Sequence, residues 1–141
     1  MALRRRRGQT LVETALVLPL LMLLVFGIVE IARAASILQT LDNAARDGAQ
    51  WSARPIEDTN SLPLVSDVQA RVAADAAAAG VTVSPFAVSV NQEVDQTVNG
   101  LVTSYSQVQV HYTYSFVTPL ISAIIPSVTL TGDAIMRNET N

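Results

Sequence analysis

An uninterrupted apolar segment near the N-terminus constrains this chain more than any other feature. Four consecutive arginines, Arg4 to Arg7, precede it, and no charged residue occurs from Thr14 to Val29. As a helix, residues 10–29 would extend about 30 Å, which equals the thickness of the hydrocarbon core of a bilayer. We therefore predict a membrane-spanning helix over residues 9–33. Because cytoplasmic flanks are rich in arginine, we expect the N-terminus in the cytoplasm and residues 34–141 outside.

The charge of the chain is divided between a basic tip and an acidic remainder. Residues 1–8 hold four arginines and no acid, whereas residues 9–141 hold five arginines and all twelve acidic residues, a net charge of −7. This distribution argues against nucleic acid as a partner, and the basic tip is typical of a leader that orients the chain in the membrane. The chain has no cysteine, so its small exported domain must be held together without disulfides.

The helical pattern continues beyond the predicted membrane span. Residues 34–53 contain no proline and their apolar side chains recur at helical spacing, so they are expected to form the outer half of the same helix, stopping before Pro55. After a polar loop, a second helix is predicted from about Leu64 to Ala79. Its buried face would hold Val68, Val72, Ala76 and Ala79.

From residue 81 the apolar residues alternate with polar ones, which is typical of strands. The alternating segments are 81–95, 101–116 and 127–137, and Asn99-Gly100 between the first two is a hairpin signal. Pro85 is expected to break the first of them. In the last one, Val128, Leu130, Ala134 and Met136 would point inward. The fold class predicted is α+β: residues 54–141 supply a helix and three or four antiparallel strands that pack on the outer half of the long helix.

A second informative pattern surrounds Gly8. A basic leader, a glycine and then an apolar helix with Glu13 five residues after the glycine is the processing signature of type IV pilin-like proteins. Cleavage after Gly8 would leave a charged amine on Gln9, while Glu13 would be a carboxylate near the edge of the hydrocarbon, where an unpaired charge costs a few kcal/mol. The amine of a neighbouring subunit, or of its own helix, could compensate it, which would make Glu13 a register residue for helix–helix assembly. Alternatively, Glu13 lies among the headgroups or is protonated, and Gly8 merely flanks the span.

The stretch GQTLVETALVLPLLMLLVFGIVEIAR, followed by LQTLDNAARDGAQ, resembles TadE-like proteins, which are pseudopilins or minor pilins of the tight-adherence (Flp-type) pilus assembly system. The resemblance covers about residues 8–50 and, more loosely, the closing TLTGDAIMR. It implies a pilin-like outer domain, the bacterial inner membrane, and a prepilin peptidase and other pilin or minor pilin subunits as partners. By position, Gly8 precedes the cut, Gln9 is the new N-terminus and Glu13 is the assembly glutamate. The sequence departs from the family at Thr14, where an aromatic residue is usual.

Three further residues of the span are candidates for a role. Pro19 removes the hydrogen bond to the carbonyl of Ala15, so it is expected to kink or loosen the helix, which could help extraction from the bilayer; a merely tolerated membrane proline is the alternative. Glu30 and Arg33, three residues apart at the outer interface, are expected to form a local ion pair.

No pattern in the chain indicates an enzyme or a cofactor. His111 is the only histidine and there is no cysteine, so a metal site has no ligand set, and neither a nucleophile elbow nor a phosphate-binding glycine loop is present. No small-molecule substrate is therefore predicted. The competing interpretation is a single-pass membrane-anchored binding domain that does not polymerise. Secretion after cleavage at Ala32-Arg33-Ala34 is disfavoured, because the apolar region is too long and the arginine is unusual at such a site.

Overall fold

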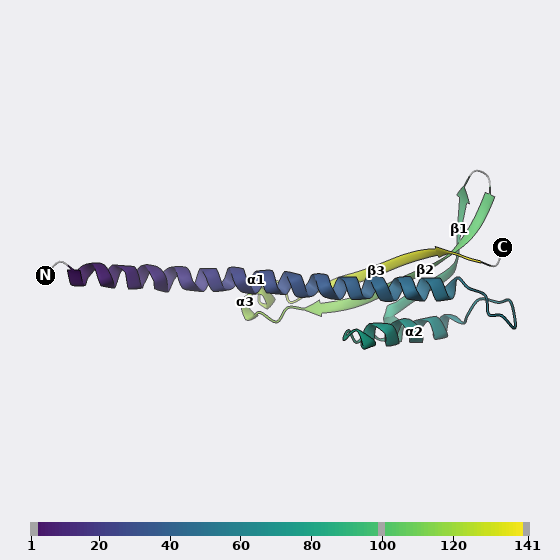
Figure 1. The fold of residues 1–141 in the computed structure, drawn as a ribbon, viewed down its shortest axis with the longest axis horizontal. Coiled ribbons are helices and arrows are strands. Elements are labelled where there is room, and N and C mark those ends of the chain that lie inside the picture. The colour runs from purple at the N-terminus through teal and green to yellow at the C-terminus, as the bar shows by residue number, and fades with distance from the viewer. Residues whose placement is uncertain (1–2, 99–100, 140–141) are drawn as a thin grey trace.

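The computed structural model describes residues 3–98 and 101–139 of the chain. Three α-helices, one 3-10 turn and three strands follow one another along these residues (Figure 1). They are α1 (Leu3–Ser52), α2 (Val65–Ala78), η1 (Pro85–Ala87), β1 (Val88–Val98), β2 (Leu101–Ser115), α3 (Pro119–Ser122) and β3 (Ser127–Arg137).

Helix α1 is the dominant element of the structure. Its 50 residues form one continuous helix, about 75 Å long at the usual rise per residue, and its N-terminal half projects alone beyond the rest of the chain (Figure 1). Within the described residues, it is the one helix long and apolar enough to cross a membrane, with a mean hydropathy of 2.6 over its most apolar window. Only 6% of that window is buried inside the structure, so this part of α1 is not the core helix of a folded domain.

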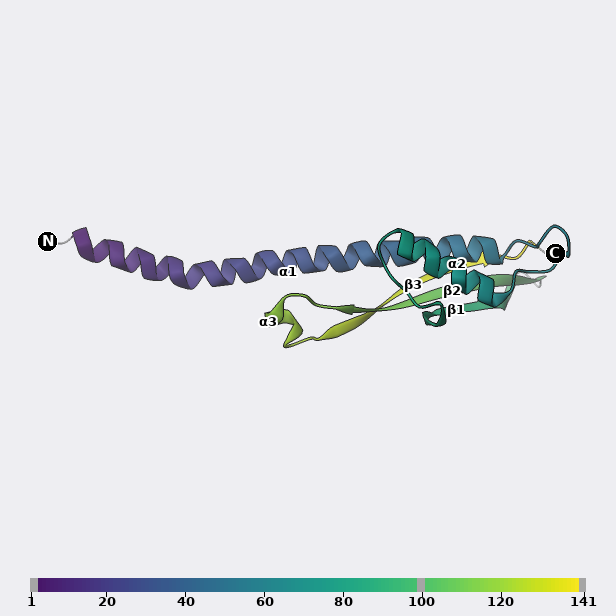
Figure 2. The same cartoon turned by 90° about the horizontal axis from the view of Figure 1, so that it is seen from below.

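Pro19 lies inside α1 without interrupting it. Figure 2 shows that the helix axis bends within its N-terminal third, the part that contains Pro19. A proline in a helix lacks the N–H that bonds the preceding turn and its ring crowds the carbonyl four residues back, which bends the helix there.

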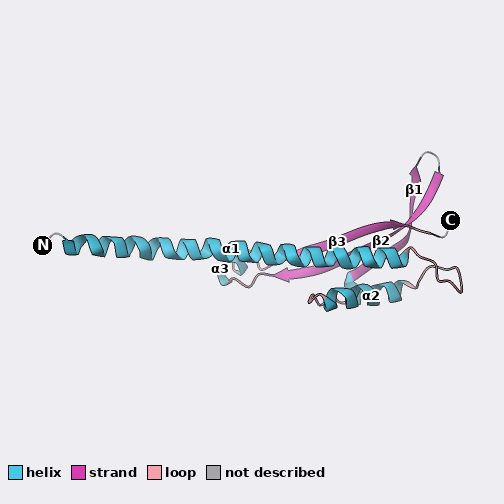
Figure 3. Ribbon diagram, viewed as in Figure 1, coloured by secondary structure: helices cyan, strands magenta, loops and turns pink. Residues whose placement is uncertain are grey.

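The three strands form one antiparallel sheet in the order β1-β2-β3 (Figure 3). Strand β2 is central: Val110 faces Val88 on one side and Gly132 on the other. The register of β1 shifts between Asn91 and Val94, where the strand carries a bulge. The predicted α+β fold and the predicted three or four antiparallel strands are confirmed, the number of strands being three.

One face of the sheet carries both long helices. The outer half of α1 covers β3 and β2, while α2 lies beside α1 and covers β1. The core between them is made of small and medium apolar side chains, several of which, such as Leu41 and Val108, are completely buried. Its buried members are Leu41, Ala44, Ala45, Ala49, Val68, Val72, Ala76, Val81, Val83, Val88, Val108, Val110 and Ala134.

Two glycines allow this close packing. A Cβ on Gly132 of β3 would lie 2.5 Å from the carbonyl carbon and 2.7 Å from the carbonyl oxygen of Leu41, so the strand and the helix backbone touch at this point. A Cβ on Gly48 of α1 would collide with a methyl group of Val72 in α2. The closest approaches of β3 and of α2 to α1 therefore occur where one of the two facing residues lacks a side chain.

Several details differ from the sequence predictions. Ala79 is exposed, and Ala73 is buried in its place, because α2 ends at Ala78. The first strand begins only at Val88, since Pro85 opens a 3-10 turn instead of continuing a strand. Val128 is 40% exposed because it stands at the start of β3, before the strand reaches the core. The predicted Asn99-Gly100 turn lies outside the described residues.

Candidate functional site

The residues singled out from the sequence at the start of α1 all lie on its projecting part. Gly8, Gln9 and Glu13 are helical and exposed. Where side chains are described, Glu13 has no hydrogen-bond or ion-pair partner. It lines a shallow groove of about 410 Å³, whose other members are Thr14, Val17, Leu18 and Leu21. Gln9 and Glu13 are four residues apart, so they share one face of the helix.

Gly8 has no packing role in the part of the chain whose side chains are described. A Cβ at this position would meet nothing within 4 Å, although a glycine inside a helix costs about 1 kcal/mol relative to alanine. The fold itself therefore gives no reason for a glycine here.

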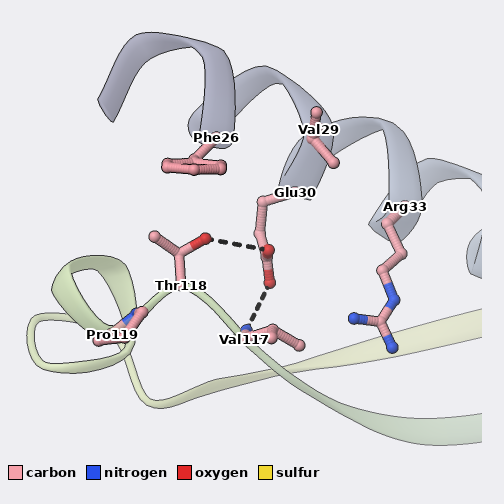
Figure 4. A pocket seen from close by; sticks show the side chains of 7 residues that line it. All are labelled: Phe26, Val29, Glu30, Arg33, Val117, Thr118 and Pro119. Carbon is pink, nitrogen blue, oxygen red and sulfur yellow. Dashed lines mark hydrogen bonds between the residues drawn. The ribbon is translucent and has the colours of Figure 1, made fainter. Parts of the chain in front are cut away.

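A second carboxylate, Glu30, is the one described polar side chain of the predicted span that the structure buries, with 5% of its surface exposed. Its Oε1 accepts hydrogen bonds from the Val117 backbone N–H at 2.7 Å and the Tyr114 hydroxyl at 3.0 Å. Its Oε2 accepts one from the Thr118 hydroxyl at 3.3 Å (Figure 4). We call Glu30, Tyr114, Val117 and Thr118 the Glu30 cluster. It ties α1 to the segment that follows β2.

The predicted ion pair between Glu30 and Arg33 does not form in the structure. Ion pairs within 4.0 Å in the described part of the chain join Arg54 to Glu139 and Arg71 to Asp75, and none joins Glu30 to Arg33. The Glu30 carboxylate turns instead toward a loop that presents three donors to it. Arg33 lies one turn further along the helix and lines the same groove (Figure 4).

Tyr114 fixes the geometry of the cluster from the side of the sheet. It is 2% exposed, and its ring meets that of Phe116 edge-on, with the centroids 5.3 Å apart and an interplanar angle of 87°. Burial raises the pKa of Tyr114 above its ordinary value of 10.0, and the hydrogen bond to Glu30 raises it further. The phenol therefore stays protonated near neutral pH and remains a hydrogen-bond donor to Glu30.

Beside the Glu30 cluster lies a mainly apolar groove of about 330 Å³. It runs between α1 and the start of α3 and is lined by Phe26, Val29, Glu30, Arg33, Val117, Thr118 and Pro119 (Figure 4). Across the described residues, no group of three or more His, Cys, Asp or Glu side chains could hold a metal ion.

The partners of Glu30 could not be identified from the sequence. They lie 84 to 88 residues further along the chain, and no local pattern joins segments so far apart. The available signal was the presence of a carboxylate inside an otherwise apolar segment, since such a group needs hydrogen-bond donors.

Comparisons with known proteins add one finding. No curated protein and no solved structure matches the chain. Residues 8–50 match the model of the family described as TadE-like protein. Together with the long apolar helix, this match fits a membrane-anchored, pilin-like protein.

Proposed function

We propose that this protein is a pseudopilin or minor pilin that acts in tight-adherence (Flp-type) pilus assembly. It crosses the bacterial inner membrane once, with the N-terminus in the cytoplasm and the α+β domain outside. The observation that carries this proposal is the exposed apolar surface of the projecting part of α1. It is interrupted early by Glu13, whose carboxylate has no partner among the described side chains. Such a surface is suited to pack against the equivalent helices of other pilin or minor pilin subunits.

The position of Glu13 explains why assembly would depend on it. Along α1, Glu13 lies about 25 Å before Glu30, near the cytoplasmic edge of the hydrocarbon. An unpaired carboxylate at that depth costs a few kcal/mol, whereas a cation at the same depth would remove much of that cost. The amine formed on Gln9 by leader cleavage provides such a cation, on the same helix or on a neighbour. Pairing with a neighbour would fix the axial stagger of the two helices.

Processing by a prepilin peptidase is supported by the context of Gly8. The residue is exposed, it follows the four arginines of the leader, and no packing contact requires it to be glycine. A peptidase that works at the membrane surface needs an accessible peptide bond, and a residue without a side chain leaves that bond open. The proposed leader is residues 1–8, and the mature chain begins at Gln9.

The first experiment tests the role of Glu13. In cells that carry the other pilus components, Glu13→Ala should abolish pili while the outer domain remains folded, because Glu13 lies on the projecting part of α1 and has no hydrogen-bond or ion-pair partner in the described part of the chain. Glu57→Ala, which removes an exposed acid from a loop outside the membrane, is the matched control and should leave pili unchanged. Normal piliation of the Glu13→Ala cells would reject the role given to this residue.

The second experiment tests processing. The intact mass of the protein extracted from membranes should correspond to a chain that lacks residues 1–8, and Gly8→Val should block this loss. Gly27→Val is the matched control, because a Cβ at Gly27 also meets nothing within 4 Å and the site lies well inside the span. A mature chain that keeps its arginines in a host with an active prepilin peptidase would favour the alternative, a non-polymerising single-pass anchor for a small binding domain.

A further inference from the structure

The segment between β2 and β3 combines exposure with an unusual lack of charge. No Asp, Glu, Lys, Arg or His occurs between His111 and Asp133. Residues 117–126, which we call the α3 loop, include three apolar side chains that the structure leaves open: Val117 is 63% exposed, Ile124 78% and Ile125 51%. Solvent-facing loops of a water-soluble domain are normally polar, so the composition of this loop requires an apolar environment.

The Glu30 cluster sets the height of this loop along α1. The Val117 N–H and the Thr118 hydroxyl both bond the Glu30 carboxylate, so the loop is held at the outer end of the predicted span. Phe26, which lines the same groove as Pro119, lies about 6 Å deeper along the helix. In both Figure 1 and Figure 2, α3 lies closer to the N-terminal end of α1 than any strand does. The loop thus reaches the level of the last turns of the spanning segment.

The backbone of the α3 loop is also suited to a medium that cannot hydrogen-bond. Five successive N–H groups donate within the loop: Ile121 and Ser122 to the Thr118 carbonyl, Ala123 to that of Pro119, and Ile124 and Ile125 to that of Ile121. The Ser122 hydroxyl donates to the Pro119 carbonyl. Pro119 and Pro126 have no N–H to satisfy. Internal bonding of this kind lowers the cost of placing the loop at the edge of the hydrocarbon, because unsatisfied backbone groups are costly in an apolar medium.

We propose that the α3 loop inserts into the outer leaflet of the bilayer, so that the protein contacts the membrane at two places, α1 and this loop. The occupant of the apolar surface is lipid hydrocarbon, because the loop continues the apolar surface of α1 that already faces the bilayer. Val117, Ile124 and Ile125 face the acyl chains, and the half-buried ring of Phe116 lies near the headgroups, where aromatic rings are favoured. The outer domain is thereby held against the membrane surface.

The chain has no cysteine, which allows a site-specific test in the full-length protein. Single cysteines are introduced as Ile124→Cys, Phe26→Cys and Val102→Cys, labelled with the environment-sensitive fluorophore NBD, and reconstituted in vesicles of phosphatidylethanolamine and phosphatidylglycerol. Phe26 is the control inside the span, and Val102, 62% exposed in the hairpin of β1 and β2, is the control at the far end of the sheet. All three side chains are at least half exposed, so the substitutions leave the fold intact.

Quenching by two reagents separates the outcomes. Lipids with a nitroxide near the top of the acyl chain should reduce the emission at position 124 as much as at position 26, and should not affect position 102. Aqueous iodide should give the reverse order. Iodide quenching at 124 equal to that at 102 would overturn the proposal, and so would protection from both reagents, which would indicate a second copy of the chain over the loop. Failure of the lipid quencher at position 26 would instead reject the span itself.

Discussion

Replacing Gly132 by alanine tests how the sheet is joined to the long helix. Gly132 lies opposite Val110 in the sheet, and its Cα faces the backbone of α1 at Leu41. The new Cβ would lie 2.5 Å from the Leu41 carbonyl carbon, whereas ordinary contact begins at 3.4 Å, so the strand and the helix must separate by about 0.9 Å. The obstacle is backbone, and no side chain can rotate away to make room.

The expected destabilisation follows from the contacts that such a separation would loosen. Leu41, Val108 and Val110 are completely buried at this interface, and packed cores lose dispersion energy steeply as gaps open. Forcing an extra methyl group into a packed core costs about 1–3 kcal/mol, and we expect the upper end here because helix and sheet must move as units. For a domain of roughly 100 residues, a loss near 3 kcal/mol corresponds to a decrease of about 12–24 °C in Tm.

Thermal unfolding of the detergent-solubilised protein, followed by the fluorescence of its single tryptophan, measures this effect. Trp51 is half-buried near the end of α1, with the Arg71 guanidinium 5.5 Å from its ring centroid, so its emission reports on the packing of the domain. Gly27→Ala is the control: its Cβ meets nothing within 4 Å, and no decrease in Tm is expected. An unchanged Tm for Gly132→Ala would refute the argument that β3 rests directly on the backbone of α1.

Two further changes probe other contacts. Gly48→Ala should destabilise the domain because its Cβ meets a Val72 methyl group, and adding Val72→Ala should offset part of that loss. Urea unfolding of the two single variants and the double variant should give a coupling free energy of about 0.5–3 kcal/mol. Strictly additive losses would contradict this contact. Glu30→Ala should speed hydrogen exchange at the Val117 amide, which loses its acceptor, while exchange at the Ala53 amide, bonded to Ala49, should not change; equal protection of Val117 in both proteins would contradict the structure of the Glu30 cluster.

Local patterns predicted the secondary structure well and the tertiary contacts poorly. The apolar run after Arg7, the absence of proline in residues 34–53 and the alternation from residue 101 are properties of neighbouring residues, and each produced the expected element. The bounds of α2 were predicted within one residue at each end, because the preceding proline-containing loop and Gly80 limit it.

The contacts that organise the site depend on residues far apart in the chain. The Leu41 backbone approaches Gly132, and Glu30 meets donors that follow β2, so neither contact leaves a local signature. Sequence spacing suggested Arg33, three residues along the helix, as the partner of Glu30. In the structure the Glu30 carboxylate instead accepts three hydrogen bonds from residues that lie far away in the chain. The predictions for Gly8, Gln9 and Glu13 concern contacts with a peptidase and with neighbouring subunits. The structure of a single chain does not test them, and the experiments proposed above do.

The unbroken course of α1 from Leu3 to Ser52 makes the direction in which Glu13 points a function of residue count. Each residue turns a helix by about 100°, so inserting one residue between Glu13 and Phe26 would swing the carboxylate about a quarter turn around the axis relative to the sheet. Removing seven residues, nearly two whole turns, would restore its azimuth but shorten the rod by about 10 Å. The number of residues between Glu13 and the outer domain therefore sets both the direction of the carboxylate and its distance from the sheet.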